Sequence, residues 1–283
     1  MTPLAALSVG SKIPRTAFEG VVNGVFDHAC NIRLTDASLI TCTVADYFDI
    51  PRGIRVKAGG GFRFNSLLAG GASAHCRGAI LRFAGSELKI DLRDAAIWSQ
   101  AFRPKSRPSA HSVQRLWLMT FEQASFGNAF PAKNISALLA AQTPPFRGNA
   151  DSLVRSLIGR GPGLTPMGDD ILAGLLAAPG LIAPARPSSR ALAFQITRHL
   201  HTTNDISRQM LSDAAQGLFI GPIVSVMSAL YGNGCIDKSS HDLWSIGGTS
   251  GGAMFLGLLA GVACVENYRL QPTTNFPGEV KVA

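Results

Sequence analysis

The chain has 283 residues, enough for one large domain or two ordinary ones. With 46% hydrophobic and 16% charged residues it has the composition of a well-buried globular protein, and a disordered chain is excluded. The net charge of +8 lies in the first 150 residues, which carry 17 basic and 9 acidic side chains. Such a basic half suits an acidic partner subunit or anionic substrates. Because no zinc finger or aromatic RNA-binding motif is present, we expect no nucleic-acid binding.

The five cysteines are scattered, and no two of them form a CxxC pair. This usage fits a reducing compartment and argues against a disulfide framework or structural zinc. The N-terminus lacks the pattern of a signal peptide, and the apolar runs are too short for a membrane span. We therefore expect a cytoplasmic protein that does not insert into membranes.

From residue 13 to about residue 121 the pattern is mostly that of short strands separated by turn residues. The expected strands cover residues 21–26, 32–34, 38–44, 55–57, 79–83 and 87–92. The last two flank an Ala-Gly-Ser turn, which predicts a hairpin. Residues 93–101 are expected to begin a short helix.

Beyond residue 110 the hydrophobic period becomes helical. The expected helices cover residues 113–125, 135–141, 151–158, 190–201, 205–217, 220–231 and 253–265, with a further helix opening at the Thr-Pro pair near residue 165. The predicted fold class is therefore α+β. Residues 1–110 form a β-rich, basic domain, and residues 111–283 form an α-helical domain.

A glycine-rich loop in residues 158–170 is the most informative stretch of the chain. Gly161 and Gly163 allow positive φ and a close approach of the backbone to a ligand. Thr165 suits the N-cap of a helix, and Pro166 suits the first helical position. Free amides and the positive end of the helix dipole then favour an anion in front of the loop.

Asp169 and Asp170 follow this loop and precede an apolar helix. Acids in a first helical turn are favourable to the dipole, so both could be ordinary helix-start residues. Alternatively, one of them holds a magnesium ion, orients an ammonium or amide group, or acts as a base. The sequence does not establish which metal or cofactor the protein uses, and Mg²⁺ is the one candidate for a metal bound by the acidic pair. The spacing is neither that of a Walker A loop nor that of a Rossmann fingerprint.

A second glycine-rich loop covers residues 247–252 and also opens an apolar helix. The two loops could present two helix N-termini to one anionic ligand, or their glycines could simply permit close helix packing. Between them, Ser207 and Arg208 lie near another helix start. The guanidinium group of Arg208 could bind a carboxylate or phosphate through two hydrogen bonds. Alternatively, Arg208 is an ordinary surface arginine. His199 and His201 are interpreted as ordinary structural or surface residues.

The segment from Gly161 to Asp170, Gly-Pro-Gly-Leu-Thr-Pro-Met-Gly-Asp-Asp, resembles a bacterial family that includes one subunit of oxamate carbamoyltransferase. The resemblance extends to the Ile206-Ser207 helix and to residues 248–251. It implies a multi-subunit enzyme of anaerobic allantoin breakdown, a part of purine catabolism, with other carbamoyltransferase subunits as partners. The implied reaction converts oxalurate and phosphate into oxamate and carbamoyl phosphate.

The implied site would cradle a small anionic substrate with backbone amides and hold its amide nitrogens, or a metal, with the acidic pair. The candidate catalytic residues are Asp169 and Asp170, and the candidate substrate-binding residues are Gly161, Gly163, Leu164, Thr165, Gly168, Ser207, Arg208, Gly247, Gly248, Thr249, Ser250 and Gly251. Two alternatives remain open. One is a non-catalytic subunit that docks a partner or senses a ligand, and the other is a different metal- or nucleotide-dependent enzyme on the same scaffold.

Overall fold

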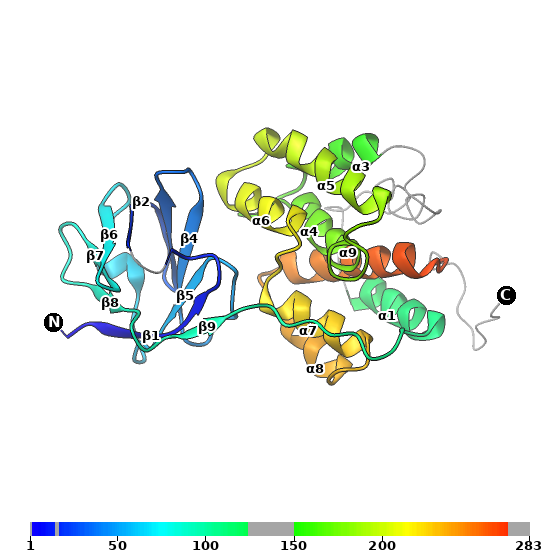
Figure 1. Cartoon of the computed structure of the whole chain (residues 1–283), viewed down its shortest axis with the longest axis horizontal. Helices are drawn as coiled ribbons and strands as arrows, with labels where there is room; N and C mark the ends of the chain where they lie inside the picture. Colours follow the sequence, from blue (N-terminus) through cyan, green and yellow to red (C-terminus); the bar gives the residue numbers. More distant parts are fainter. Residues whose placement is uncertain (1, 15–16, 124–149, 271–283) are drawn as a thin grey trace. The chain divides into compact units, whose positions relative to one another are not determined.

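The computed structural model describes residues 2–14, 17–123 and 150–270, and the chain divides into two compact units, Met1–Gln100 and Ala101–Ala283 (Figure 1). The first unit consists mainly of strands and the second of helices, so the predicted α+β class is confirmed. Within the described ranges, no helix has the length and apolar character needed to cross a membrane.

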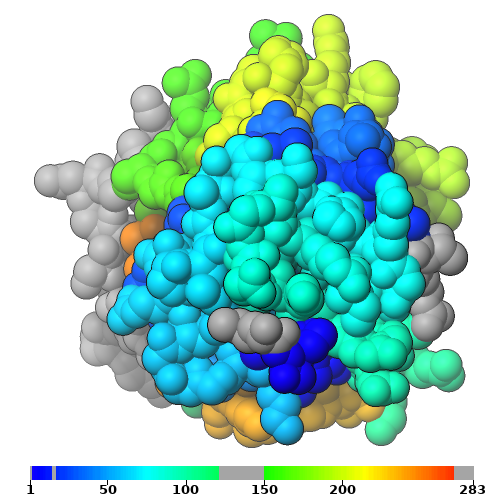
Figure 2. Space-filling model, turned by 90° about the vertical axis from the view of Figure 1, so that its left-hand side faces the viewer, coloured from blue at the N-terminus to red at the C-terminus, as the bar shows by residue number. Residues whose placement is uncertain are grey.

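The first unit is a sheet that closes on itself. Its strands are β1 (Leu4–Gly10), β2 (Ala17–Val25), β3 (Ala29–Leu34), β4 (Leu39–Val44), β5 (Gly53–Val56), β6 (Ser73–Arg77), β7 (Ile80–Phe83), β8 (Lys89–Asp91) and β9 (Ala96–Trp98). They follow the order β5-β4-β3-β2-β6-β7-β8-β1-β9, and the ring closes because β1 also pairs with β5. Alternate residues such as Ile32, Ile54 and Leu81 are fully buried inside it. In Figure 2 the residues of this unit, coloured blue to cyan, form a packed surface.

The hairpin predicted around residues 84–86 is confirmed, because β7 and β8 pair antiparallel. The prediction that a short helix begins in residues 93–101 is wrong. Residues 96–98 instead form β9, which pairs parallel with the end of β1 from Ser8 to Gly10. The sequence predicted neither β1 nor β6, since their Ala, Ser and Gly residues have little intrinsic preference for strands.

Cysteine reactivity should follow burial in this structure. Cys30 and Cys42 face each other across β3 and β4, and this neighbour together with burial holds the pKa of the Cys42 thiol well above its usual range. Burial also raises the pKa of Cys76, and it raises the pKa of Cys264 to about 12. Cys235 is exposed. Since the thiolate is the reactive form, we expect Cys235 alone to react rapidly with a thiol reagent in the native chain.

Thiol titration of the folded chain should therefore show one fast phase, which Cys235→Ser removes. Unfolding in denaturant should release all five thiols. A second fast thiol in the native chain would contradict this assignment of buried and exposed cysteines.

The second unit is helical. Its elements are α1 (Ala110–Gln123), α3 (Ala150–Leu157), α4 (Met167–Ile182), α5 (Pro187–His199), the 3₁₀ turn η3 (Leu200–Thr202), α6 (Asp205–Ala215), α7 (Gly221–Leu230), α8 (Ile236–Trp244) and α9 (Ser250–Glu266). The expected helix at 135–141 lies outside the described residues. The sequence did not predict α8, a mostly polar helix with Leu243 as its only fully buried residue.

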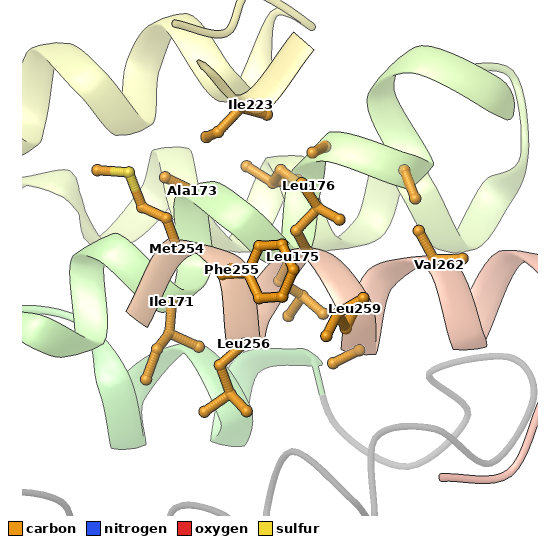
Figure 3. Packing of buried hydrophobic residues seen from close by; sticks show 14 of the residues in the cluster. Ile171, Ala173, Leu175, Leu176, Ile223, Met254, Phe255, Leu256, Leu259 and Val262 are labelled. Atoms are coloured by element: carbon orange, nitrogen blue, oxygen red, sulfur yellow. The ribbon is translucent and has the colours of Figure 1, made fainter. Parts of the chain in front are cut away.

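Helices α4 and α9 form the centre of this unit, and nearly all their residues are buried. Their apolar side chains, among them Leu175 and Phe255, pack together in Figure 3. Glycines let the two backbones touch. A Cβ atom on Gly174 would lie 1.9 Å from the carbonyl oxygen of Met254, and one on Gly257 would lie 2.0 Å from that of Ile171.

These contacts advance in the same direction along both helices. Gly257 meets the backbone of Ile171 and Leu175, and one turn later Gly261 meets Leu175 and Pro179. The two helices therefore run in the same general direction, and their N-termini lie next to each other. Close packing of helix glycines, one of the two interpretations of the sequence, is thus observed, and it brings the two glycine-rich loops together.

Candidate functional site

The two glycine-rich loops meet through a pair of hydroxyl groups. The Thr165 Oγ1 atom, just before α4, lies 3.0 Å from the Ser250 Oγ atom at the start of α9. Both residues are partly exposed, and the glycine two positions before each of them, Gly163 and Gly248, is exposed. The contact between Thr165 and Ser250 therefore marks a place where a ligand could reach both helix starts.

Several loop amides have no hydrogen-bond partner within the described part of the chain. Among the described residues, no acceptor is hydrogen-bonded to the backbone amides of Gly161, Gly163, Leu164, Thr165, Gly247, Gly248, Thr249 or Ser250. Two other candidate amides are engaged within the fold, since Gly168 donates to Arg160 and Gly251 donates to Ile246. A Cβ atom on Gly168 would lie 1.9 Å from the Leu157 carbonyl oxygen, so packing explains this glycine.

The start of α4 differs from the expectation. Thr165 was expected to cap the helix with its hydroxyl and Pro166 to occupy the first helical position. Pro166 is itself the N-cap, and no side chain caps the helix. The Thr165 hydroxyl instead donates to Asp170 Oδ2 over 3.1 Å. An N-cap oxygen accepts a first-turn amide, but Thr165 lies one residue before the N-cap position and does not fill that role.

Asp169 is fully buried and uses both carboxyl oxygens inside the protein. Its Oδ1 accepts the backbone amide of Gly159 over 2.7 Å, and its Oδ2 accepts the Thr203 hydroxyl over 2.5 Å. One carboxylate thus holds together the turn after α3 and the segment before α6. Each oxygen accepts one hydrogen bond from the fold, so these two contacts of Asp169 hold the fold together.

Asp170 is equally buried but incompletely paired. No described residue donates a hydrogen bond to its Oδ1 atom. Burial raises the pKa of the Asp170 carboxyl from its ordinary value of 3.8 to about 7, although the hydroxyls of Ser250 and Thr165 favour the ionised form and nearby Asp169 opposes it. A buried carboxyl that titrates near neutral pH is typical of an acid–base group.

The acidic pair fits a magnesium ion poorly. Mg²⁺ takes six oxygen ligands, and in proteins one or two carboxylates usually bind it directly. Here both oxygens of Asp169 are hydrogen-bonded, and Asp170 has one open oxygen in a fully buried position. No described group of three His, Cys, Asp or Glu side chains could hold a metal. We therefore derive no step through a metal ion.

The start of α6 is tied to the first loop. Asn204 caps the helix by accepting the Ser207 amide, and its side-chain amide donates to the Leu164 carbonyl over 2.9 Å. The buried Ser207 hydroxyl has no hydrogen-bond partner in the described part of the chain. Arg208 donates to the carbonyl oxygens of Leu200 and Thr203 and to Asp205, so its guanidinium braces the start of α6.

The sequence interpretation missed a basic pocket on the other side of Asp169. A cavity of about 700 Å³ is lined by Arg155, Ile158, Gly159, Arg160, Arg198, His199, His201 and Thr202. The sequence feature that could have indicated it is the grouping of basic residues in two short stretches, 155–160 and 198–201, of a C-terminal half that has no net charge. Only folding shows that these stretches face the same cavity.

Comparison with known proteins identifies the family. Residues 5–97 match the model of the AllH family N-terminal domain, and residues 157–262 match that of oxamate carbamoyltransferase subunit AllH. No solved structure matches the chain. One matched range lies in each compact unit, and together they cover more than half of the sequence. The chain therefore belongs to the family of oxamate carbamoyltransferase subunit AllH. The family expected from the sequence is confirmed.

Proposed function

We propose that this subunit binds the small carbamoyl compound of the oxamate carbamoyltransferase reaction at the contact between Thr165 and Ser250. The reaction would convert oxalurate and phosphate into oxamate and carbamoyl phosphate. The observation that carries this proposal is the meeting of two glycine-rich helix starts above a buried carboxyl with an open oxygen atom. The other subunits of the enzyme would be its partners.

The anionic groups of the substrate suit the two helix starts. Each helix N-terminus behaves like about half a positive charge, and like ends placed side by side repel each other. An anion in front of α4 and α9 relieves that repulsion and accepts hydrogen bonds from the unpaired loop amides. The carboxylate of oxalurate or oxamate and the phosphate group are anions of this kind.

The hydroxyl pair connects the ligand position to Asp170. A hydroxyl carries a single hydrogen, so when Thr165 donates to ionised Asp170, the Ser250 hydroxyl donates inward as well, to Thr165 or to Asp170 itself. Ser250 then offers only lone pairs to a ligand. When Asp170 is protonated the chain of donors reverses, and Ser250 donates outward. The protonation state of a buried group thus sets the hydrogen-bonding character of an accessible one.

This reversal supplies the proton that the reaction needs. A phosphate oxygen forms a bond to the carbamoyl carbon, the bond from that carbon to the oxamate nitrogen breaks, and the nitrogen takes a proton to become an amide. Protonated Asp170 delivers that proton through Thr165 and Ser250, and the proton released by phosphate restores it. A pKa near 7 leaves both forms of Asp170 populated at neutral pH.

We also propose that the complex works in the cytoplasm. Five free cysteines, three of them buried in the closed sheet, suit the reducing cytoplasm. In that compartment the complex would serve allantoin degradation. The basic N-terminal half would contact an acidic surface of a partner subunit.

Replacing Ser250 tests the hydroxyl pair. In the enzyme reconstituted with its partner subunits, Ser250→Ala should lower kcat for carbamoyl phosphate formation by on the order of 100-fold, because the outer donor of the chain is lost. Ser245→Ala is the matched control, since Ser245 is exposed and its hydroxyl bonds only to the Asp242 carbonyl. It should leave kcat unchanged.

The same measurement separates catalysis from ligand sensing. A raised KM with unchanged kcat in Ser250→Ala would indicate a subunit that only binds the ligand. Wild-type kcat and KM in this variant would refute a role for the hydroxyl pair.

A further inference from the structure

The basic pocket forms where three short segments meet. The end of α3 contributes Arg155, the turn after it contributes Arg160, and the end of α5 with η3 contributes Arg198, His199 and His201. The residues that line the cavity include three guanidinium groups and two imidazoles, and no carboxylate. Its volume of about 700 Å³ is within the usual range for small-molecule sites.

Most of this positive charge is not neutralised inside the protein. Asp151 bonds to Arg155 and to His199, each over 2.8 Å, and so balances one of the three guanidinium groups. Neither Arg160 nor Arg198 forms an ion pair with any residue that the structure describes. Two guanidinium groups therefore line one cavity without a direct ion-pair partner, and only Arg198 lies within electrostatic range of the Asp151 carboxylate, which already pairs with Arg155 and His199.

The walls of the pocket are held in place before any ligand arrives. Gly159 and Thr202 lie so close that a Cβ atom on Gly159 would be 2.6 Å from the Thr202 carbonyl oxygen. Behind them, Asp169 bonds to the Gly159 amide and to the Thr203 hydroxyl, and this joins the two walls. A site with fixed walls loses little conformational entropy on binding.

We propose that this pocket binds the phosphate group of a small molecule, either inorganic phosphate or a phosphate ester. A phosphate dianion matches the charge of two unpaired guanidinium groups, and the planar fork of arginine suits its oxygens. The site is separate from the contact between Thr165 and Ser250, and it does not depend on the function proposed there.

Titration calorimetry of the full chain tests the proposal. Inorganic phosphate and phenyl phosphate should each be titrated into the wild type, and the tighter ligand identifies the source of the phosphate group. The variant Arg160→Gln with Arg198→Gln should bind that ligand about 100-fold more weakly, because two charge-assisted hydrogen-bonding partners are removed. Arg190→Gln removes one positive charge from an exposed position of α5 outside the pocket and should bind as the wild type does.

Footprinting of the wild-type chain avoids any dependence on folded variants. Phenylglyoxal modifies accessible arginines, and peptide mapping should show that the ligand protects Arg160 and Arg198 but not Arg190. The same protection should persist in Ser250→Ala, which separates this pocket from the loop contact. Equal modification of Arg160 and Arg198 with and without both phosphate compounds, or unweakened binding by the double variant, would overturn the proposal.

Discussion

Asp170→Asn is expected to make the enzyme on the order of 100-fold to 10,000-fold slower while making the chain more stable above neutral pH. The loss of rate follows from the loss of an ionisable group at the inner end of the hydroxyl pair. Asparagine has nearly the same shape as aspartate, but it does not gain or lose a proton near neutral pH. It therefore cannot reverse the direction of the hydrogen bonds between residue 170, Thr165 and Ser250. The wild-type rate should also change with pH through a step near pH 7, and the variant should lack that step.

The gain in stability follows from the raised pKa of Asp170. The folded chain binds the proton more tightly than the unfolded chain, so this carboxyl favours folding most below about pH 4. That contribution is lost as the pH rises through about 7. The shift from 3.8 to about 7 corresponds to a loss of on the order of 4 kcal/mol in the free energy of unfolding at higher pH. Asparagine does not titrate and avoids the loss.

Denaturant unfolding at pH 5 and pH 8 measures this difference. The advantage of Asp170→Asn over the wild type should grow between these two values. Asp169→Asn is the matched control, because it removes the negative charge that accepts the Gly159 amide and the Thr203 hydroxyl in a fully buried position. It should lower stability by about 1–3 kcal/mol at either pH. A wild type as stable as Asp170→Asn at pH 8 would show that Asp170 is not held in an unfavourable ionised state.

Gly174→Ala should destabilise the helical unit by about 3 kcal/mol or more, the second large effect that we expect. In an ordinary helix this change is stabilising, because alanine is the better helix former. Here the new methyl group would lie 1.9 Å from the Met254 carbonyl oxygen, so α4 and α9 would have to separate. The distance between Thr165 and Ser250 depends on that packing, so enzymatic activity should fall as well.

Gly70→Ala provides the comparison, since a Cβ atom there meets nothing within 4 Å and its φ is not in the left-handed region. Thermal unfolding should give a lower Tm for Gly174→Ala and an unchanged Tm for Gly70→Ala. An unchanged Tm for Gly174→Ala would mean that the two helices are not packed backbone to backbone.

Strongly patterned elements could be predicted from the sequence. The β7–β8 hairpin was predicted from its Ala-Gly-Ser turn, and α6 lies within the helix predicted over residues 205–217. The predicted helix at residues 93–101 failed because β9 gains its hydrogen bonds from β1, far away in the chain. Local preference carries no information about such a partner.

By itself the sequence determined the family and the α+β class, and it pointed to the glycine-rich loops with their acidic pair as the candidate site, because spacing and composition are local properties. The different environments of Asp169 and Asp170 were decided only by the tertiary structure. Adjacent residues on a helix point about 100° apart, and the groups that they meet come from distant segments. The contact between Thr165 and Ser250 exists because the backbones of α4 and α9 pack against each other. The basic pocket exists because the hydrogen bonds of Asp169 join the turn after α3 to the segment before α6. In both cases the residues that meet are connected by no local pattern in the sequence.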